Sequence, residues 1–309
     1  MVEGTPAPAV AGTTTPHLAD YVELTKPGIT ALIVAVGIGG YFLAAPTPIR
    51  ILPLAELVLF GALASGGAAA LNHYFDRDLD RKMRRTRERP LAEGRIAPVG
   101  HALLLGLVLS ALGIGGAFLL LNALTALAIF LGGATYVGIY TLWLKRRSSW
   151  NIVVGGFAGS APALAGAAAA VGHFTLGSLA LALLLFLWTP PHFWSLALRL
   201  RGDYRLAGLP MLPDMEDPAY SGRIVVVSAA LLIPASLVLW WAGPIAIWAG
   251  GLLVALAVIF TAVTAPLWRE VTPARALRGF VFSGIYLLSV LAVVIVDSVL
   301  SHPEFVLGR

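Results

Sequence analysis

Long apolar runs, each bounded by turn-forming or charged residues, dominate the pattern of this 309-residue chain. Each run is about 20 residues long, the length that an α-helix needs to cross roughly 30 Å of hydrocarbon. Cuts between neighbouring runs fall at the turn-forming residues Asn122, Gly172-His173 and Gly243-Pro244. The runs cover residues 28–45, 52–74, 99–119, 122–143, 150–171, 174–198, 222–242, 244–266 and 278–300. The pattern therefore predicts nine transmembrane helices.

Composition agrees with an all-α membrane protein and excludes other classes. Hydrophobic residues make up 58% of the chain and charged residues 12%, and the mean hydropathy is +0.85, far above the range of soluble domains. The absence of Cys excludes a disulfide framework and a thiolate metal site. Residues 1–27 contain one Lys and no Arg, and no small-residue cleavage site precedes a soluble domain. We therefore expect the first run to be a membrane span and the whole chain to be polytopic.

The distribution of Lys and Arg predicts the orientation. The segment 75–98 carries eight of them, 144–149 three, 199–221 three and 267–277 two, whereas the alternate loops hold only Arg50. Under the positive-inside rule the basic loops and the N-terminus are cytoplasmic and the C-terminus lies outside, in the cell membrane. The pI near 9.7 then reflects juxtamembrane charge, and we expect no nucleic-acid partner.

The same pattern indicates a single domain. Residues 1–20, rich in Pro, Thr and Ala, are expected to be a disordered tail. Residues 21–301 are expected to form the nine-helix domain, and residues 302–309 a short C-terminal tail. Charged loops follow the second and the sixth runs, which suggests a duplicated bundle, although no strong internal repeat is present.

The densest cluster of charge lies where the second run leaves the membrane. Asn72, Asp76 and Asp80 recur at every fourth position, so on a helix they drift by about 40° per step and share one face. Asp78 lies about 200° from Asp76 and faces elsewhere. Carboxylates with an amide on one face, without Cys or clustered His, suit hard cations such as Mg²⁺ and the phosphates they carry.

Basic residues follow these carboxylates. Arg85 and Arg89 are four residues apart, so on a helix they would present two guanidiniums to phosphate oxygens. The alternative is that the cluster consists of positive-inside anchors and their salt-bridge partners. For Arg77, Arg81 and Lys82 the sequence favours neither interpretation.

A second cluster begins at the end of the fourth run. Lys145, Arg146 and Arg147 are either topology determinants or a second diphosphate clamp that faces the first across the bundle. Gly155 and Gly159 follow in a small-residue stretch, which is typical of a close helix–helix contact. The same two positions would also make room for a bulky planar ligand.

A third cluster lies within the sixth run, in the string Trp188-Thr-Pro190-Pro191-His192-Phe-Trp194. A Pro-Pro pair is expected to break the helical hydrogen-bond ladder and to expose carbonyl groups. An ionisable side chain inside a membrane span is a functional candidate, so we assign His192 a role in binding. The alternative is a hydrogen-bonded core histidine.

The loop after this run carries the carboxylate of Asp203 followed by Tyr204. Asp203 either supplies a further Mg²⁺ ligand or caps a short helix in the loop. The other histidines lie at the ends of spans or in a tail and are assigned no role; they are His17, His73, His101, His173 and His302.

Taken together, these strings resemble the UbiA superfamily of intramembrane prenyltransferases, and within it the heme O synthase branch. The resemblance covers roughly residues 20–300, and its third block is the most specific. It rests on Asn72-x₃-Asp76-x₃-Asp80 through Met83, Arg85-Thr86 and Arg89-Pro90-Leu91; on Tyr140-Thr141, Leu144-Lys145-Arg146 and Asn151-Ile-Val-Val-Gly-Gly; and on Trp188 to Trp194 with Asp203-Tyr204 through Pro213. The superfamily's second Asp-x₃-Asp motif is incomplete here, because positions 199 and 207 are Arg and Ala.

The resemblance implies transfer of a farnesyl group from farnesyl diphosphate to the 2-vinyl group of heme B, with addition of water, giving heme O. It implies Mg²⁺ as cofactor, held by Asp76, Asp80 and Asp203, with Asn72 as a further catalytic residue. It implies diphosphate binding by Arg85, Arg89, Lys145, Arg146 and Tyr204, and heme binding by His192, Trp188 and Trp194. The expected partners are the two substrates, the lipid bilayer and a downstream heme A synthase.

Three rival functions make different demands on the sequence. A quinone or aromatic-acid prenyltransferase of the same superfamily should carry a complete second Asp-x₃-Asp pair and lack Trp-Thr-Pro-Pro-His. A CDP-alcohol phosphotransferase needs an Asp-x₂-Asp-Gly-x₂-Ala-Arg run, which is absent. A transporter has broken helices and an ion pathway across the membrane. Here the ionisable residues gather at one face, and only Glu56, Asp297 and His192 lie within spans.

Overall fold

The structure is a computed structural model that describes residues 16–45, 49–212 and 217–301. Within these ranges it contains nine helical spans that are long and apolar enough to cross a membrane, and it contains no strand. The spans are Pro27–Ala44, Ile51–Asp80, Gly100–Leu121, Ala123–Arg146, Asn151–Val171, Leu176–Arg199, Pro218–Ala242, Ile247–Trp268 and Pro273–Ser301. The prediction of nine transmembrane helices is confirmed, with ends displaced by a few residues.

Several spans are built from more than one helical segment. The first two are α2 (Pro27–Ala44) and α3 (Ile51–Asp80), followed by α5 (Gly100–Gly116) with η1 (Ala117–Leu121), and by α6 (Ala123–Ala134) with η2 (Thr135–Trp143) and η3 (Leu144–Arg146). The fifth and sixth are α7 (Asn151–Gly155) with α8 (Phe157–Val171), and α9 (Leu176–Arg199). The last three are α12 (Pro218–Ala230) with α13 (Leu232–Ala242), α14 (Ile247–Thr264) with η4 (Ala265–Trp268), and α15 (Pro273–Ser301). Three short helices, α1 (Leu18–Leu24), α4 (Pro90–Glu93) and α10 (Arg201–Leu206), complete the described elements used below.

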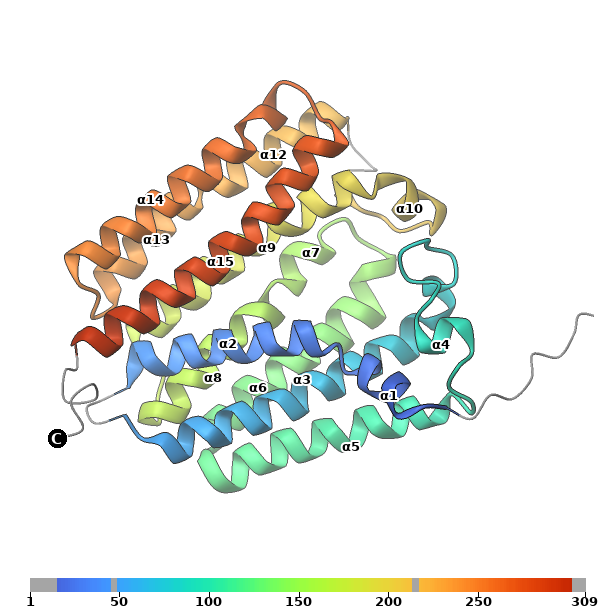
Figure 1. Ribbon diagram of the computed structural model, residues 1–309, viewed down its shortest axis with the longest axis horizontal. Helices are drawn as coiled ribbons and strands as arrows, with labels where there is room; N and C mark the ends of the chain where they lie inside the picture. Colours follow the sequence, from blue (N-terminus) through green and yellow to red (C-terminus); the bar gives the residue numbers. More distant parts are fainter. Residues whose placement is uncertain (1–15, 46–48, 213–216, 302–309) are drawn as a thin grey trace, which may run out of the picture.

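The helices pack as two groups that share a central seam. Helices α2, α3, α5, α6 and α8 contact one another in the first group, and α9 with α12 to α15 form the second. Contacts of α2 with α15 and of α8 with α9 join the groups (Figure 1). This arrangement places the ends of α3, α9 and α15 around a common interior.

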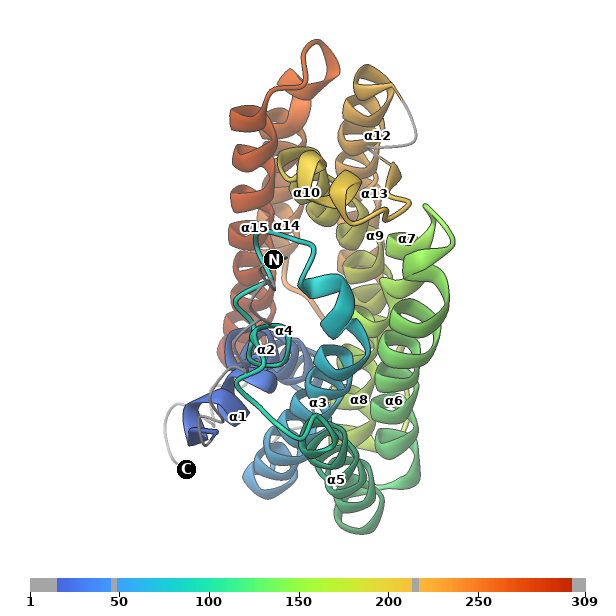
Figure 2. The same cartoon turned by 90° about the vertical axis from the view of Figure 1, so that its right-hand side faces the viewer.

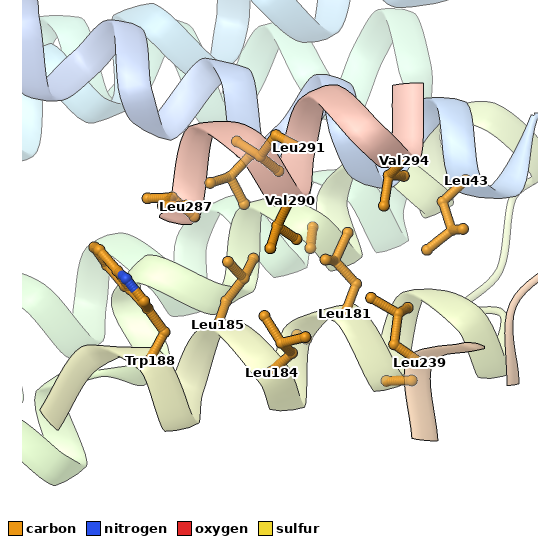
Figure 3. Close-up of a cluster of buried hydrophobic side chains, with 14 of the residues drawn as sticks. Leu43, Leu181, Leu184, Leu185, Trp188, Leu239, Leu287, Val290, Leu291 and Val294 are labelled. Atoms are coloured by element: carbon orange, nitrogen blue, oxygen red, sulfur yellow. The ribbon is translucent and has the colours of Figure 1, made fainter. Parts of the chain in front are cut away.

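Within the second group, a row of apolar side chains on α9 packs against a row on α15 (Figure 3). On each helix these side chains recur at intervals of three and four residues, so they form one stripe. The side chains are Leu181, Leu184, Leu185 and Trp188 on α9, and Leu287, Val290, Leu291 and Val294 on α15. Because lipid is as apolar as leucine, such an interface is stabilised mainly by dispersion and close packing.

Helices α2 and α8 approach each other more closely than larger residues would allow. A Cβ atom at Gly40 would collide with the backbone of Ala163, and one at Gly166 would collide with the backbone of Gly37. Backbone-to-backbone contact of this kind is the usual role of small residues in membrane bundles. The close contact predicted for Gly155 is confirmed against the Tyr140 ring, but Gly159 faces open space and does not belong to a seam.

Large apolar side chains also cover the outer surface of the bundle. Leu104 is 62% exposed, Leu119 77% and Ile247 79%, all on predicted spans. A soluble protein would not expose so many of them, whereas a bundle in hydrocarbon must.

The short helices gather at one end of the bundle, as Figures 1 and 2 show for α1, α4 and α10. A second buried cluster ties this end together, because Leu79 at the end of α3 packs with Leu198 of α9 and Tyr204 of α10. The expected domain start at residue 21 falls inside α1, where Asp20 is buried against Arg95. Of the expected tail 1–20, residues 1–15 lie outside the described residues, as does the expected tail 302–309.

The helix α9 runs without interruption through Pro190 and Pro191. The expectation of a broken helix is therefore wrong. The two prolines remove the backbone donors that would bond the carbonyls of Phe186 and Leu187. The segment 188–191 is buried, so packing against neighbouring helices keeps the helix continuous despite the missing bonds.

Candidate active site at the basic end of the bundle

Asn72, Asp76 and Asp80 lie on one face of α3, as their spacing predicts. Their exposures are 3%, 0% and 3%, so all three point into the bundle. Asp78 points away, is exposed, and pairs with Arg77 and Arg81 at 4.0 and 3.6 Å. The helix ends at Asp80, so the three side chains form a buried polar strip where the span ends.

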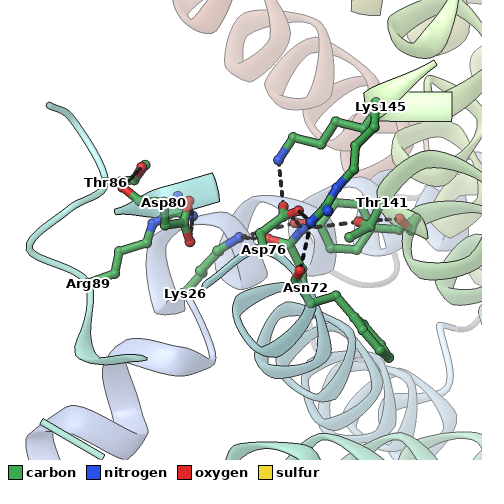
Figure 4. A network of polar contacts seen from close by, with 11 residues as sticks. Lys26, Asn72, Asp76, Asp80, Thr86, Arg89, Thr141 and Lys145 are labelled. Atoms are coloured by element: carbon green, nitrogen blue, oxygen red, sulfur yellow. Dashed lines mark hydrogen bonds and ion pairs between the residues drawn. The ribbon is translucent and has the colours of Figure 1, made fainter. Parts of the chain in front are cut away.

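Side chains from other spans reach this strip (Figure 4). Lys26, directly before α2, donates to Oδ1 of Asn72 at 2.6 Å, and Lys145 of η3 donates to Oδ2 of Asp76 at 2.5 Å. The Asn72 amide donates to Oδ2 of Asp76 at 2.8 Å and to Oγ1 of Thr141 at 3.0 Å. The network therefore joins three spans around one carboxylate.

Arg89 holds the carboxylate at the end of α3. Its Nη1 atom lies 2.9 Å from both carboxylate oxygens of Asp80. Residues 81–89 are turns and not a helix, so the expected i, i+4 pairing of Arg85 with Arg89 is wrong. Arg85 is exposed, whereas Arg89 directly precedes α4 and points inward.

The fourth span faces the strip through a π-helical segment, η2. Such a segment shifts the register of side chains, and π-bulges are frequent at functional sites. Here the Thr141 hydroxyl donates to the carbonyl of Tyr136, 2.8 Å away, while its oxygen accepts from Asn72. The Tyr136 hydroxyl accepts from Lys26 at 3.1 Å, and its ring stacks on Tyr140 with centroids 6.0 Å apart.

Positive charge exceeds negative charge in this network. Lys26, Arg89, Lys145 and Arg146 surround the carboxylates of Asp76 and Asp80; Arg146 lies 3.9 Å from Asp76. Burial, together with the charges of Arg89 and Lys145, lowers the pKa of the Lys26 ammonium to about 7. The excess of cations makes the site suited to a polyanionic ligand, which would return Lys26 to its charged form.

The side-chain oxygens at the site are suitable ligands for a hard divalent cation. Carboxylate and amide oxygens are what Mg²⁺ prefers, and Oδ1 of Asp76 is buried without a hydrogen-bond partner. However, among the described residues no three His, Asp or Glu side chains are close enough to hold one ion, so Asp203 is not gathered with Asp76 and Asp80. Instead, Lys145 forms an ion pair with Asp76 and Arg89 forms one with Asp80. The carboxylate oxygens of Asp76 and Asp80 are therefore suitable ligands for Mg²⁺, and Asp203 does not join them.

Helix α10 covers the site from the second helix group. Tyr204 is 7% exposed and packs against the end of α3, and burial raises the pKa of its phenol. Asp203 is half-buried and lies in the first turn of α10, after Leu200 at the N-cap position. The alternative in which Asp203 caps this helix is therefore wrong.

His192 lies on α9, where its ring is packed between aromatic residues. It stacks on Trp188 with centroids 4.4 Å apart and lies 4.8 Å from the Phe280 ring of α15. Its Nδ1 atom is 2.5 Å from the hydroxyl of Ser283, which fixes the ring, while Nε2 makes no hydrogen bond to a described residue. The ring is half-buried, so one nitrogen is oriented and the other is available.

Trp194 does not share this environment. It is buried in the second cluster, together with Met83 and Tyr204. The expectation that Trp188 and Trp194 flank a planar ligand beside His192 is therefore wrong. The step of six positions from Trp188 to Trp194 rotates the second indole by about 240° on the helix, toward α10.

Three polar residues at the site had no assigned role. Lys26 is the lone cation before the first apolar run, directly before a proline, and that position was the available signal. The contact of Thr141 with Asn72 depends on the π-helical register of η2, which the sequence pattern did not predict. His73 is buried, and neither of its ring nitrogens has a partner among the described residues. His73, Lys26 and Arg89 line a cavity of about 300 Å³.

Comparison with known families identifies the class of protein. A family model described as the UbiA prenyltransferase family matches residues 32–293. The chain belongs to this family of enzymes, and it is a multi-pass membrane prenyltransferase. The resemblance noted from the sequence is thereby confirmed.

Several curated relatives carry one particular name, protoheme IX farnesyltransferase. The protein of that name from Sulfurisphaera tokodaii is 40% identical over 287 residues, which cover 90% of this chain and 93% of the relative. The protein named protoheme IX farnesyltransferase 1 from Paramagnetospirillum magneticum is 45% identical over 224 residues, covering 72% and 78%.

Solved structures share the fold at low identity. A UbiA homologue from Archaeoglobus fulgidus bound to DMAPP and Mg²⁺ has a TM-score of 0.68 and 16% identity, covering 89% of this chain and 99% of the homologue. A structure concerned with digeranylgeranylglyceryl phosphate synthase has a TM-score of 0.74 and 20% identity, covering 91% and 98%.

Proposed function

We propose that this chain transfers a farnesyl group from farnesyl diphosphate to the 2-vinyl group of heme B, with addition of water, to give heme O and diphosphate. The observation that carries the proposal is the polar network at the basic end, where cations outnumber the carboxylates of Asp76 and Asp80 beside an apolar bundle. A diphosphate fits the charge, and a prenyl chain fits the bundle. The names of the curated relatives support the farnesyl donor and the heme acceptor.

The first task of these residues is to stabilise the leaving group. When the bond between the allylic carbon and the diphosphate oxygen breaks, the electron pair stays on the diphosphate, so nearby positive charge lowers the barrier. Lys26, Lys145 and Arg89 are the cations placed to donate to its oxygens. Mg²⁺, held by Asp76 and Asp80, supplies further neutralisation of the diphosphate. The solved structure of the Archaeoglobus fulgidus homologue, which is bound to DMAPP and Mg²⁺, supports this assignment.

The second task is to present the acceptor. The vinyl group supplies two electrons to the allylic cation and forms a carbon–carbon bond, and water then adds to the porphyrin-stabilised cation and loses a proton. No protein nucleophile is needed. We assign His192 to heme binding, because Nδ1 is held by Ser283 and Nε2 is left to ligate iron. Trp188 and Phe280 orient the imidazole ring.

We also propose that the basic end faces the cytoplasm of the cell membrane, because eight Lys and Arg residues lie between 75 and 98. The heme product then leaves into the bilayer or to a heme A synthase that oxidises it further. Cysteine accessibility at the exposed positions Arg84 and Arg50, in inverted and right-side-out vesicles, tests the orientation.

The deciding experiment for the reaction is direct. Purified protein is incubated with heme B, farnesyl diphosphate and Mg²⁺, and extracted heme is analysed by mass spectrometry. We expect heme with one farnesyl group and one water added, and no product with EDTA. If heme is unchanged while an aromatic acid is prenylated, the acceptor is a quinone precursor and the heme assignment fails.

A second experiment tests the role of His192. The variant His192→Ala should lose or shift the absorption band of bound heme and lower turnover, while binding of farnesyl diphosphate is retained. The variant Leu183→Ala, at an exposed position on the same helix, serves as the control. An unchanged heme spectrum and unchanged turnover in His192→Ala would make this histidine structural.

A further inference from the structure

A second cavity lies on the opposite face of α3 from the catalytic strip. It has a volume of about 520 Å³ and lies between the end of α3 and the segments η2 and η3. Its walls are Tyr74, Phe75, Arg77 and Asp78 on one side, and Thr141, Leu142, Arg146 and Arg147 on the other. Asp76 and Asp80 do not line this cavity, which shares only Thr141 and Arg146 with the polar network around them.

Three arginines dominate the charge of this cavity. Its single carboxylate, Asp78, is already paired with Arg77 and with Arg81, so it does not neutralise the others. Arg147 is exposed, and its guanidinium makes no hydrogen bond or ion pair with a described residue. The cavity therefore carries net positive charge with unused donors.

Two of the guanidiniums are held in place by the fold. Arg77 donates to the carbonyl of Tyr74 at 2.7 Å, and its guanidinium lies 4.8 Å from the centroid of the Tyr74 ring. Arg146 donates to the carbonyl of Phe75 at 3.0 Å. Each contact uses one edge of the planar group and leaves other N–H donors for a ligand, in the geometry that suits phosphate oxygens.

The surroundings of the cavity are those of a membrane interface. Leu142 is 50% exposed, and the adjacent Trp143 is 55% exposed, at the end of a membrane span. Half-exposed indoles at span ends lie at the level of lipid headgroups, and basic residues there attract anionic lipids. A free phosphate would gain the charge contacts but nothing from the apolar wall.

We propose that this cavity binds the phosphate of an anionic phospholipid headgroup, with Arg77, Arg146 and Arg147 as donors and with the acyl chains along Leu142 and Trp143. The site does not depend on the proposed reaction. It lies behind the catalytic strip, because Thr141 lines the cavity and also accepts from Asn72. Bound lipid would therefore support the wall of the active site.

The test uses the full-length protein in nanodiscs that contain phosphatidylcholine with increasing phosphatidylglycerol, and bound lipid is counted by native mass spectrometry after detergent release. The double variant Arg77→Gln/Arg147→Gln should weaken retention of phosphatidylglycerol by about tenfold, because each basic residue near the headgroup contributes a few-fold. The control Arg84→Gln/Arg87→Gln removes the same charge at exposed positions outside the cavity and should retain the lipid. Arg147→Gln alone, which loses no contact within the protein, should show a smaller loss in the same direction.

Two outcomes would overturn the proposal. Equal loss of lipid in the cavity variant and in the control would mean that attraction is spread over the whole basic end. Displacement of phosphatidylglycerol by an equimolar amount of inorganic phosphate or diphosphate would mean that the cavity recognises a free anion. Retention of phosphatidylglycerol but not phosphatidylcholine, with no displacement by either anion, supports the lipid site.

Discussion

The two ends of this bundle use charge in different ways. At the basic end, the charged side chains that point into the bundle pair with one another, as Lys145 does with Asp76 and Arg89 with Asp80. At the opposite end, charged side chains pair with backbone. Arg50 donates to the carbonyl of Ala170 at the end of α8, and Asp297 accepts from the amide of Ala246 at the start of α14.

This difference helps to distinguish a ligand-binding site from a structural contact. A charge bound to a helix end satisfies a backbone group that has no partner within the helix, and it favours the helix dipole. At the opposite end each of these charges stands alone. At the basic end several cations surround two carboxylates, and this excess of cations leaves donors for an anionic ligand. An unpartnered buried carboxylate oxygen does not distinguish the ends, because Asp76 and Asp297 each have one. We therefore expect changes at the basic end to affect turnover and changes at the opposite end to affect stability.

The largest effect is expected for Asp76→Asn. Loss of this carboxylate removes the metal ligand that we propose and its leaving-group stabilisation, so kcat should fall by about 10³-fold or more. The matched control is Asp78→Asn, on the exposed face of the same helix, which should stay within about twofold. Turnover measured by mass spectrometry of heme checks both. Equal losses in the two variants would contradict the one-face site.

The second comparison sets Lys26 against Arg50, the basic residues that flank α2. Lys26→Met should lower kcat/KM by about 10²-fold, because the donor that we propose for the diphosphate is lost. Arg50→Met should lower the thermal midpoint by a few degrees, because a carbonyl at the end of α8 loses its donor, and leave kcat/KM unchanged. A loss of turnover in Arg50→Met would erase the distinction between the two ends.

Arg89→Lys tests whether shape or charge matters at the basic end. One nitrogen of Arg89 contacts both oxygens of Asp80, which leaves the rest of the guanidinium for phosphate. Because an ammonium cannot do both, we expect a loss of about tenfold or more in kcat/KM, close to the loss in Arg89→Ala. Wild-type kinetics in the Lys variant would reduce Arg89 to a topology anchor.

The smallest effect is expected for Asp297→Ala. It removes the acceptor that caps α14 from a neighbouring helix, which should cost about 1 kcal/mol and lower the thermal midpoint by about 2–4 °C. Activity per folded molecule should be unchanged. A drop in kcat without a change in the thermal midpoint would show that this end also takes part in catalysis.

Helical periodicity was the part of the site that the sequence could predict. Asn72, Asp76 and Asp80 share a face because one helix continues through them, and a helix repeats regardless of its neighbours. The pairing of Arg85 with Arg89 was wrong because the chain turns after Asp80, so periodicity no longer applies. The prediction that Trp194 lies beside His192 was wrong for a related reason, because its position on α9 directs it toward α10 and away from His192.

By itself, the sequence determined that the chain is a helical membrane bundle with most of its charge at one end, because water-to-lipid transfer acts on each segment separately. The described residues contain the nine apolar spans that it predicts. Only the tertiary structure decided which charges meet. Lys26 reaches Asn72 across 46 residues, and Lys145 reaches Asp76 across 69, because packing of the spans brings their ends together. The π-helical register of η2 likewise turns Thr141 toward Asn72. These contacts depend on the distances between helices, which local hydropathy does not encode.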